Sequence, residues 1–246
     1  MNYNLFYGKP SGNDYESIID MFSGSKINSV RTSSLPLLAF WKNTEERLSE
    51  LLRFLKITSK ENLLCFEYPT SSGGKGKSSM TDLMILSNNN KIAIEAKFTE
   101  VNEKHETIVD WLITGNKENK KDVLRRWINI IQPFSKSISN EHLNTIPYQF
   151  LHRTASACKN NSNKAYVVYQ IFYDEHTKSN LENFKYLLSK SVQAVNPCKD
   201  LSFYIWEIEV IQKVKEEEIS IVFKKIKQTE IYRFKKGKLS PILNFT

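Results

Sequence analysis

Two apolar runs joined by a short polar segment place the strongest constraint on how this chain folds. The runs cover 81–86 and 92–98, and the segment between them reads SNNNK. Apolar runs of this length, bounded by turn-forming residues, are typical of strands. Asn tolerates the left-handed backbone of tight turns, so a turn at Asn88–Asn89 predicts a β-hairpin.

The register of this hairpin decides which residues share a face. With the turn placed as above, Leu83 lies opposite Ile94, and the aliphatic side chains of both strands gather on one face. Asp82 then lies opposite Glu95 on the other face, and Lys97 follows two residues further along the same side. A slip by one residue would scatter both sets. The predicted register therefore brings two carboxylates and one ammonium group together.

Asp82 and Glu95 repel each other at this spacing unless a cation lies between them. Mg²⁺, or Mn²⁺ as a substitute, would take an oxygen from each carboxylate together with water and substrate phosphate. A lysine beside such a pair orients an attacking water or stabilises negative charge on phosphate oxygens. The alternative is an ordinary hairpin with solvent-facing charges. Glu95 and Lys97, however, flank Ala96 inside the apolar strand IAIEAKF, where an unpaired charge is costly.

The pattern of Asp82, a short loop and Glu95-Ala96-Lys97 at the end of an apolar strand resembles the motif of the PD-(D/E)xK nuclease superfamily. The resemblance implies a restriction-endonuclease-like fold that cleaves DNA phosphodiester bonds. It implies Asp82, Glu95 and Ala96 at the metal. It also implies Lys97 as the catalytic lysine. Thr81 stands in place of the proline of the motif, at a position that the superfamily varies freely.

The same resemblance adds residues from two predicted helices. Members commonly place a helix glutamate near the metal, and Glu46 or Glu50 matches it, with Glu50 favoured. A Gln or Arg on a helix after the E-x-K strand also approaches the active site, which implies a catalytic role for Gln149 and a phosphate clamp at Arg153. The alternative for 146–158 is a small-residue packing helix with a polar outer face.

The loop 71–79 (SSGGKGKSS), which precedes Asp82, is basic and rich in glycine. Lys75 and Lys77 lie in this loop, and its place before the acidic strand predicts contacts with DNA phosphates. A solvated connector is the alternative. The loop also comes close to the nucleotide-binding pattern G-x-x-x-x-G-K-[ST]. Ser71 stands at the first glycine, however, and a strand follows where that pattern requires a helix.

Composition sets the broad class of the protein. No apolar run approaches the ~18 residues that cross a bilayer, so we expect no membrane segment. Three well-separated cysteines and the lack of a secretion-signal pattern favour a cytoplasmic protein with reduced thiols. Thirty-five Lys and Arg against 27 Asp and Glu give a net charge of +8, which favours a polyanionic partner such as DNA.

The histidines and tryptophans add little chemistry. The four histidines lack the spacing of a zinc site. The four tryptophans, Trp41, Trp111, Trp127 and Trp206, lie within apolar patterns, which predicts core packing in preference to base stacking.

The remaining pattern predicts an α/β fold in which helices flank a mixed sheet. Besides the hairpin, strands are predicted over 62–68 (ending at Pro69), 165–173, 201–211, 218–226 and 230–235, and helices over 15–22, 43–57, 105–113, 119–131, 146–158 and 178–195. The last three strands alternate, which predicts a C-terminal antiparallel meander. We expect one nuclease domain over 1–246, with a core of about 43–211 and decorations at 1–42 and 212–246. The superfamily resemblance in element order covers about 43–173.

These observations predict a Mg²⁺-dependent DNA endonuclease, of the type II restriction kind or a related defence nuclease. A non-catalytic nucleic-acid-binding protein on the same fold and a repair or mobile-element nuclease are the alternatives. Cutting both strands of a palindromic site would favour a two-fold homodimer.

Overall fold

The computed structural model describes residues 2–8, 14–22, 27, 29–73, 78–102, 104–160, 163–215 and 230–242. The strands are β1 (Asn2–Tyr7), β2 (Glu61–Thr70), β3 (Ser79–Ser87), β4 (Asn90–Lys97), β5 (Ala165–Tyr173), β6 (Leu201–Gln212), β7 (Tyr232–Phe234) and β8 (Lys238–Pro241). The helices are α1 (Tyr15–Met21), α2 (Ser34–Trp41), α3 (Thr44–Leu55), α4 (Ile108–Ile113), α5 (Lys117–Ile131), α6 (Asn140–Leu143), α7 (Tyr148–Cys158) and α8 (Leu181–Val195). Short 3₁₀ turns cover Thr99–Asn102, Gln132–Phe134 and Lys178–Asn180.

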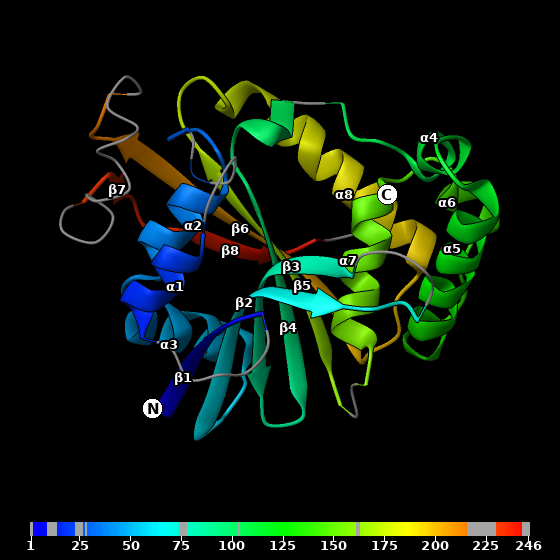
Figure 1. Ribbon diagram of the computed structural model, residues 1–246, viewed down its shortest axis with the longest axis horizontal. Coiled ribbons are helices and arrows are strands. Elements are labelled where there is room, and N and C mark those ends of the chain that lie inside the picture. Colours follow the sequence, from blue (N-terminus) through cyan, green and yellow to red (C-terminus); the bar gives the residue numbers. More distant parts are fainter. Residues whose placement is uncertain are drawn as a thin grey trace.

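The described strands form one mixed sheet between two layers of helices, as the α/β prediction required. Their order is β1-β2-β3-β4-β5-β6-β7, and β8 also pairs with β6. The pairs β1–β2, β4–β5 and β5–β6 are parallel, whereas β2–β3 and β3–β4 are antiparallel. Helices α1–α3 lie on one side of the sheet and α4–α8 on the other (Figure 1). The sheet therefore has two buried faces, and each carries its own apolar core.

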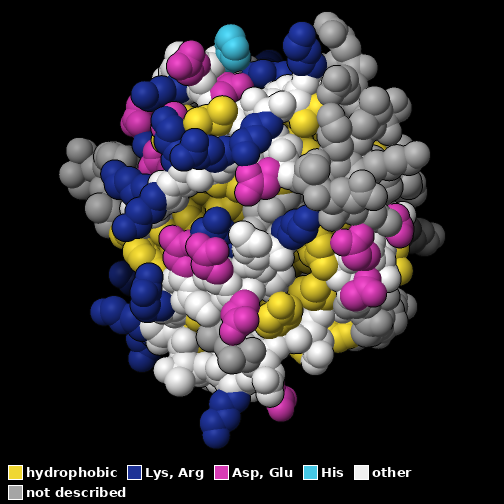
Figure 2. Space-filling model, turned by 90° about the vertical axis from the view of Figure 1, so that its left-hand side faces the viewer, with side chains coloured by type: hydrophobic (Ala, Val, Ile, Leu, Met, Phe, Trp, Pro, Cys, Tyr) yellow, Lys and Arg dark blue, Asp and Glu magenta, His cyan; other side chains and the backbone are white. Residues whose placement is uncertain are grey.

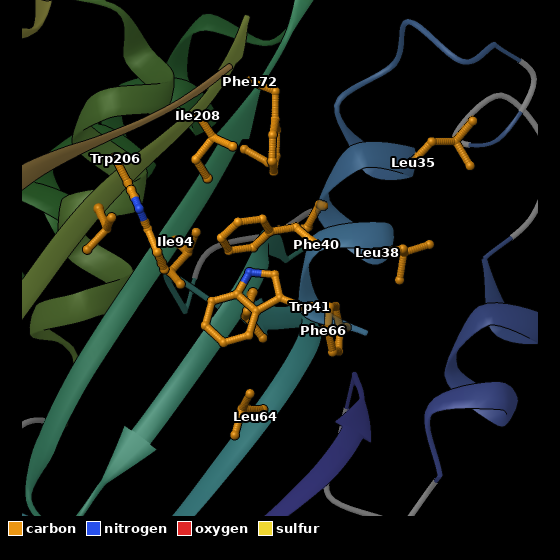
Figure 3. Close-up of a cluster of buried hydrophobic side chains, with 14 of the residues drawn as sticks. Leu35, Leu38, Phe40, Trp41, Leu64, Phe66, Ile94, Phe172, Trp206 and Ile208 are labelled. Carbon is orange, nitrogen blue, oxygen red and sulfur yellow. The ribbon is translucent and has the colours of Figure 1, made fainter. Parts of the chain in front are cut away.

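The core under α1–α3 is dominated by aromatic side chains. Phe40 and Trp41 lie between α2 and the strands (Figure 3). The ring of Phe40 lies edge-on to that of Trp206 at 5.1 Å, an arrangement that aromatic pairs favour. The indole Nε1 of Trp41 donates to Oε1 of Gln170 on β5 at 3.0 Å, so these two buried polar atoms satisfy each other.

The predicted hairpin is confirmed as β3–β4, with the predicted register. Leu83 pairs with Ile94, and Ser87 pairs with Asn90 across the two-residue turn. Asn88 in this turn has a φ of 53°, in the left-handed region that Asn tolerates better than most residues. The side chains of Leu83 and Ile94 belong to the core under α1–α3, which leaves Asp82 and Glu95 on the face toward α7.

Strand β2 does not end at Pro69, as the sequence suggested, but continues to Thr70. Pro69 still pairs with Met80 of β3. The partner strand on the other side, β1, has already ended at Tyr7 opposite Phe66. The missing N–H of Pro69 therefore faces an unpaired edge, where proline is tolerated in a strand.

The two ends of the chain differ most from the prediction. Strand β1 and helix α2 were not predicted, although β1 extends the sheet in parallel with β2 and α2 buries most of its length. At the C-terminus, β7 and β8 both pair antiparallel with β6, at different positions along it. The described strands thus form an antiparallel edge on β6. The predicted strand over 218–226 lies outside the described residues.

Helix boundaries shift where capping chemistry decides them. Helix α4 begins at Ile108, three residues later than predicted, because Thr107 and Asp110 form a capping box. Helix α7 begins at Tyr148, two residues later than predicted, and Pro147 stands at its N-cap. Asn43 precedes α3 but makes no side-chain cap hydrogen bond. In each case the helix itself is present near the predicted place.

No helix in the described part of the chain has both the length and the apolar character to span a bilayer. On the side of α1–α3, Lys and Arg side chains gather along the upper left edge, with Asp and Glu side chains among them (Figure 2). The described surface there is of mixed sign.

Candidate active site

The ends of β2, β3 and β4 meet helices α4, α5 and α7 around an open cavity of about 580 Å³, the central cavity. Three carboxylates reach it from three neighbouring strands: Glu67, Asp82 and Glu95. Lys97 from β4 and Gln149 from α7 also line the cavity. The structure therefore brings together the hairpin residues that the sequence singled out and adds Glu67.

Strand register explains why the three carboxylates gather. Phe66 pairs with Leu83 in β2–β3, so the next residue along β2 is Glu67 and the one before Leu83 is Asp82. Leu83 pairs in turn with Ile94 of β4, and Glu95 follows Ile94. Each of the three strands thus carries one acidic residue at the same level of the sheet. Side chains of directly paired residues point to the same face, so the three carboxylates lie together.

Glu95 is buried and paired with two cations. Its Oε1 accepts a hydrogen bond from Lys97 Nζ at 2.8 Å, and its Oε2 forms an ion pair with the guanidinium of Arg153 on α7. Arg153 also donates from Nη1 to the carbonyl oxygen of Met80 on β3 at 2.8 Å. A buried carboxylate with two such partners is held in one position.

Asp82 lacks comparable compensation. Its Oδ2 accepts a hydrogen bond from the backbone N–H of Ala96 at 2.8 Å. Burial raises the pKa of Asp82 to about 7, and the nearby charge of Glu95 acts in the same direction. For Glu95, burial also acts to raise the pKa, but Arg153 and Lys97 outweigh it and hold the pKa at about 2. Two adjacent carboxylates thus differ in the ease with which they ionise.

The cations respond to the same charges. Burial favours the neutral form of Lys97, yet Glu95 and Asp82 outweigh it and raise the pKa of the ammonium group. Arg153 behaves likewise, its pKa being raised by Glu95 and Asp82 against burial. Glu95 and Asp82 thus hold both buried cations in the charged form.

Helix α7 presents Gln149 and His152, which lie about one turn apart, to this floor. Gln149 accepts a hydrogen bond from Lys97 Nζ through Oε1 at 3.2 Å. His152 Nδ1 lies 2.6 Å from the hydroxyl of Ser79 on β3. Burial and the charge of Arg153 lower the pKa of His152 to about 3, so its imidazole is neutral at pH 7. Gln149 therefore holds the lysine, and His152 ties α7 to the acidic strand.

Glu67 is the site residue that the sequence analysis missed. It is buried, and its φ of 50° lies in the left-handed region, which is rare for a residue inside a strand. Strained backbone of this kind concentrates at functional sites. A signal was available, because Glu67 interrupts the apolar strand LLCFEY in the way that Glu95 interrupts its own strand.

Other predicted site residues lie elsewhere or are placed differently. Glu50 lies on α3 beside Arg47, their Oε2 and Nη1 atoms 3.5 Å apart, at a separate cavity that α3 forms with the segment before β8. Glu46 lines the same separate cavity. Arg153 is buried against Glu95, so the structure places it as a partner of that carboxylate and away from the surface position of a phosphate clamp. Lys75 and Lys77 lie outside the described residues.

Asp82 and Glu95 are the carboxylates of this cavity that could hold a hard divalent cation. Carboxylates are the ligands that Mg²⁺ prefers, and a cation near Asp82 would relieve the repulsion and burial that raise the pKa of this group. Among the residues that the structure describes, no group of three or more His, Cys, Asp or Glu side chains is arranged as a complete metal site. Binding would therefore rest on Asp82 and Glu95, with Ala96, which lines the cavity between Glu95 and Lys97, and with water and substrate.

A sequence model of one protein family, described as a domain of unknown function (DUF6946), matches residues 11–216. Comparison with curated proteins and with solved structures gave no match. The matched range includes all three carboxylates of the central cavity.

Proposed function

We propose that this chain, which belongs to the DUF6946 family, is a Mg²⁺-dependent deoxyribonuclease with a restriction-endonuclease-like core. The observation that carries the proposal is the gathering of Asp82, Glu95, Lys97 and Gln149 on one cavity floor. The order α3, β2, β3, β4, α7, β5, with α4, α5 and α6 inserted between β4 and α7, supports it, because it contains the element order that the resemblance implies. The net charge of +8 supports a nucleic-acid substrate.

The residues of the chain divide the work of phosphodiester hydrolysis. Asp82, Glu95 and the backbone at Ala96 would hold the metal ion. Lys97 remains charged at neutral pH, because its carboxylate neighbours raise its pKa, and it would stabilise negative charge on the phosphate oxygens in the transition state. Gln149 fixes the direction of the lysine, and Arg153 fixes that of Glu95.

When bound, Mg²⁺ would neutralise the scissile phosphate and activate water for in-line attack. Fixed side chains around the cavity serve this chemistry because they need little reorganisation when charge develops. Glu67 would add negative charge beside Asp82 and thereby strengthen cation binding.

A restriction or related defence role in the cytoplasm is our proposal for the biological setting, with a repair or mobile-element role as the second choice. Palindromic cleavage of both strands would call for a homodimer. A non-catalytic nucleic-acid-binding protein would keep the basic charge but would have no need to retain Lys97 against Glu95 in a buried pair.

Cleavage of supercoiled plasmid and of a single-stranded circle tests the proposal. We expect nicking or linear product with Mg²⁺ or Mn²⁺ and none with EDTA. Asp82→Asn and Lys97→Met should lower the rate at least about 100-fold, the usual scale for loss of one electrostatic group in an active site. Glu50→Gln is the matched control, because this carboxylate lies at another cavity and its removal should leave the rate unchanged. Wild-type rates in Asp82→Asn would overturn the proposal.

A further inference from the structure

One wall of the central cavity is aromatic, although its floor is charged. Trp111 from α4, Trp127 from α5 and Tyr148 from α7 form this aromatic wall. The ring of Trp111 is stacked on that of Tyr148 with centroids 5.5 Å apart and planes 7° apart, and on that of Trp127 at 5.3 Å and 26°. Trp127 is buried, whereas Trp111 and Tyr148 are only half-buried. Trp111 packs against the edge of the core under α4–α8, as expected, and also borders the cavity.

The aromatic wall is held in place by a cation, Lys120, and by His152. Lys120 Nζ lies 5.0 Å from the centre of the Trp111 ring and donates to the carbonyl oxygen of Trp111 at 2.6 Å. Both Tyr148 and Trp127 also contact the ring of His152. His152 in turn is hydrogen-bonded to the hydroxyl of Ser79 near the floor. The wall is therefore a rigid surface next to positive charge and next to Gln149 of the candidate site.

Apolar surface continues beside this wall. Met80 on β3 lines the cavity and is 39% exposed. An apolar surface of this kind beside a polar floor marks a binding surface more often than a simple exterior. Its occupant must combine a flat apolar part with negative charge.

We propose that the aromatic wall is a stacking subsite for an unpaired nucleobase, so that the substrate is single-stranded or locally unpaired DNA. This inference rests on the proposed nuclease function. A nucleotide has a flat ring for Trp111 and Tyr148 and a phosphate for the cations beside them. In a duplex each base is already stacked on its neighbours, so its face reaches a side chain only after unstacking.

Binding measured in EDTA tests this subsite without cleavage. Fluorescence anisotropy would compare a labelled 12-nucleotide single strand with the blunt duplex of the same sequence. We expect the single strand to bind more tightly. Trp111→Ala should weaken single-strand binding about 5- to 100-fold, the range of one base–aromatic stack, while Trp111→Phe retains most of the affinity. Tyr186→Ala is the control, since Tyr186 is an exposed aromatic on α8, on a helix that does not line the cavity.

Abasic oligonucleotides separate stacking from charge. A strand with abasic sites throughout its centre keeps the phosphates, so Trp111→Ala should not weaken its binding further. Tyr148→Ala provides a second reading if Trp111→Ala does not fold, and should show the same dependence on the base. Equal affinity for single strand and duplex in the wild-type protein, or equal losses on normal and abasic strands, would overturn the subsite.

Two further outcomes keep this inference distinct from the proposed function. Base-dependent binding without any Mg²⁺-dependent cleavage would support the subsite and refute the nuclease. Cleavage that depends on Asp82 but not on Trp111, with a duplex as the preferred substrate, would support the nuclease and refute the subsite. A shift of Trp111→Ala in sedimentation equilibrium from dimer to monomer, with oligonucleotide binding unchanged, would assign the wall to contact between copies and overturn the subsite.

Discussion

Asp82 is the residue at which the charge balance of the site is least favourable. Burial and Glu95 raise its pKa to about 7, compared with about 3.9 for an unperturbed Asp. The folded protein therefore binds a proton that the unfolded chain has lost between these two values. Because the folded state binds more protons there, stability falls as the pH rises through this window.

Asp82→Asn should therefore stabilise the protein at high pH. We expect an increase of about 1–3 kcal/mol in the free energy of unfolding at pH 8 and almost none at pH 4, because the penalty of ionising Asp82 exists only above the window. Urea unfolding at the two pH values measures this. Mg²⁺ should raise the Tm of the wild-type protein at pH 8 but hardly that of the variant, by ligand linkage. Equal stability of the two proteins at pH 8 would contradict the assigned charge state.

Replacing Glu95 should lower the stability of the protein, whereas replacing Asp82 should raise it, because Glu95 neutralises two buried cations. Glu95→Gln leaves Arg153 and Lys97 facing each other without their shared partner. Breaking a buried pair in this way typically costs about 3–5 kcal/mol. Thermal unfolding at pH 7 should thus show a much lower Tm for Glu95→Gln than for Asp82→Asn, although both lose one carboxylate of the same site. Similar Tm values would mean that the pairing with Arg153 contributes little.

Sequence reasoning found Asp82, Glu95 and Lys97 because strand periodicity alone places them on one face. It chose Glu50 as a further acidic residue, because a helix glutamate was implied by resemblance alone. Glu67 was missed although the same criterion, a charge inside an apolar strand, applies to it. The criterion needs the β2–β3 pairing as well, and pairing between strands that are separated by a long loop is not fixed by a turn.

At the scale of elements, helix α5 offers a test of nucleic-acid contact on matched residues. Arg125 and Arg126 are neighbours that both pair with Asp122. Arg126 lies on the side of α5 toward the loop that starts at Ser71, since a Cβ on Gly73 would be 3.2 Å from its Nη1. Arg125 is 73% exposed and points away from the cavity-lining side of the helix.

Arg126→Ala should weaken DNA binding and reduce the slope of log K against log salt by about 0.7–0.9, the value for one lost phosphate contact. Arg125→Ala should leave both quantities unchanged, because the same charge is removed from the other side of the helix. Titrations at four salt concentrations in EDTA would measure the slope. The sequence predicts Lys75 and Lys77 as phosphate contacts. Neutralising both should reduce the slope of log K against log salt by about one to two units. Identical slopes for Arg125→Ala and Arg126→Ala would refute a DNA contact that is confined to the Arg126 side of α5.

The elements that sequence reasoning predicted well are those with a clear period. The β3–β4 hairpin and strand β5 match closely because apolar runs and turn residues define them locally. Helix α2, which reads SLPLLAFW, is apolar on nearly every side. A helix that is buried all round has no amphipathic pattern to detect, and its proline further weakens the signal. Strand β1 is short and was missed for the same lack of pattern.

At the scale of the whole molecule, the first 42 residues, which the sequence analysis predicted to be a decoration, contribute to the core. Phe40 and Trp41 of α2 pack against Trp206 and Phe172 from the central strands. Their helix covers the face of the hairpin opposite to the candidate site (Figure 3). The carboxylates on one face of β3–β4 are thus positioned in part by the aromatic core on the other.

A chain of residues 43–246 should accordingly fail to form the native fold. Its loss of β1, α1 and α2 would expose Leu83, Ile94 and their neighbours, and large buried aromatics are worth about 3–5 kcal/mol each when removed singly. A domain of this size has only about 5–15 kcal/mol of net stability, so losing Phe40 and Trp41 together is enough to unfold it. We expect the shortened protein to lose its near-ultraviolet circular dichroism, to bind a hydrophobic dye and to be digested rapidly by protease, whereas the full chain resists. The single substitution Phe54→Ala, at a half-exposed aromatic on α3, is the control and should cost less than about 1 kcal/mol. Cooperative unfolding of the 43–246 chain, with Mg²⁺-dependent cleavage retained, would show that the site does not need the N-terminal core.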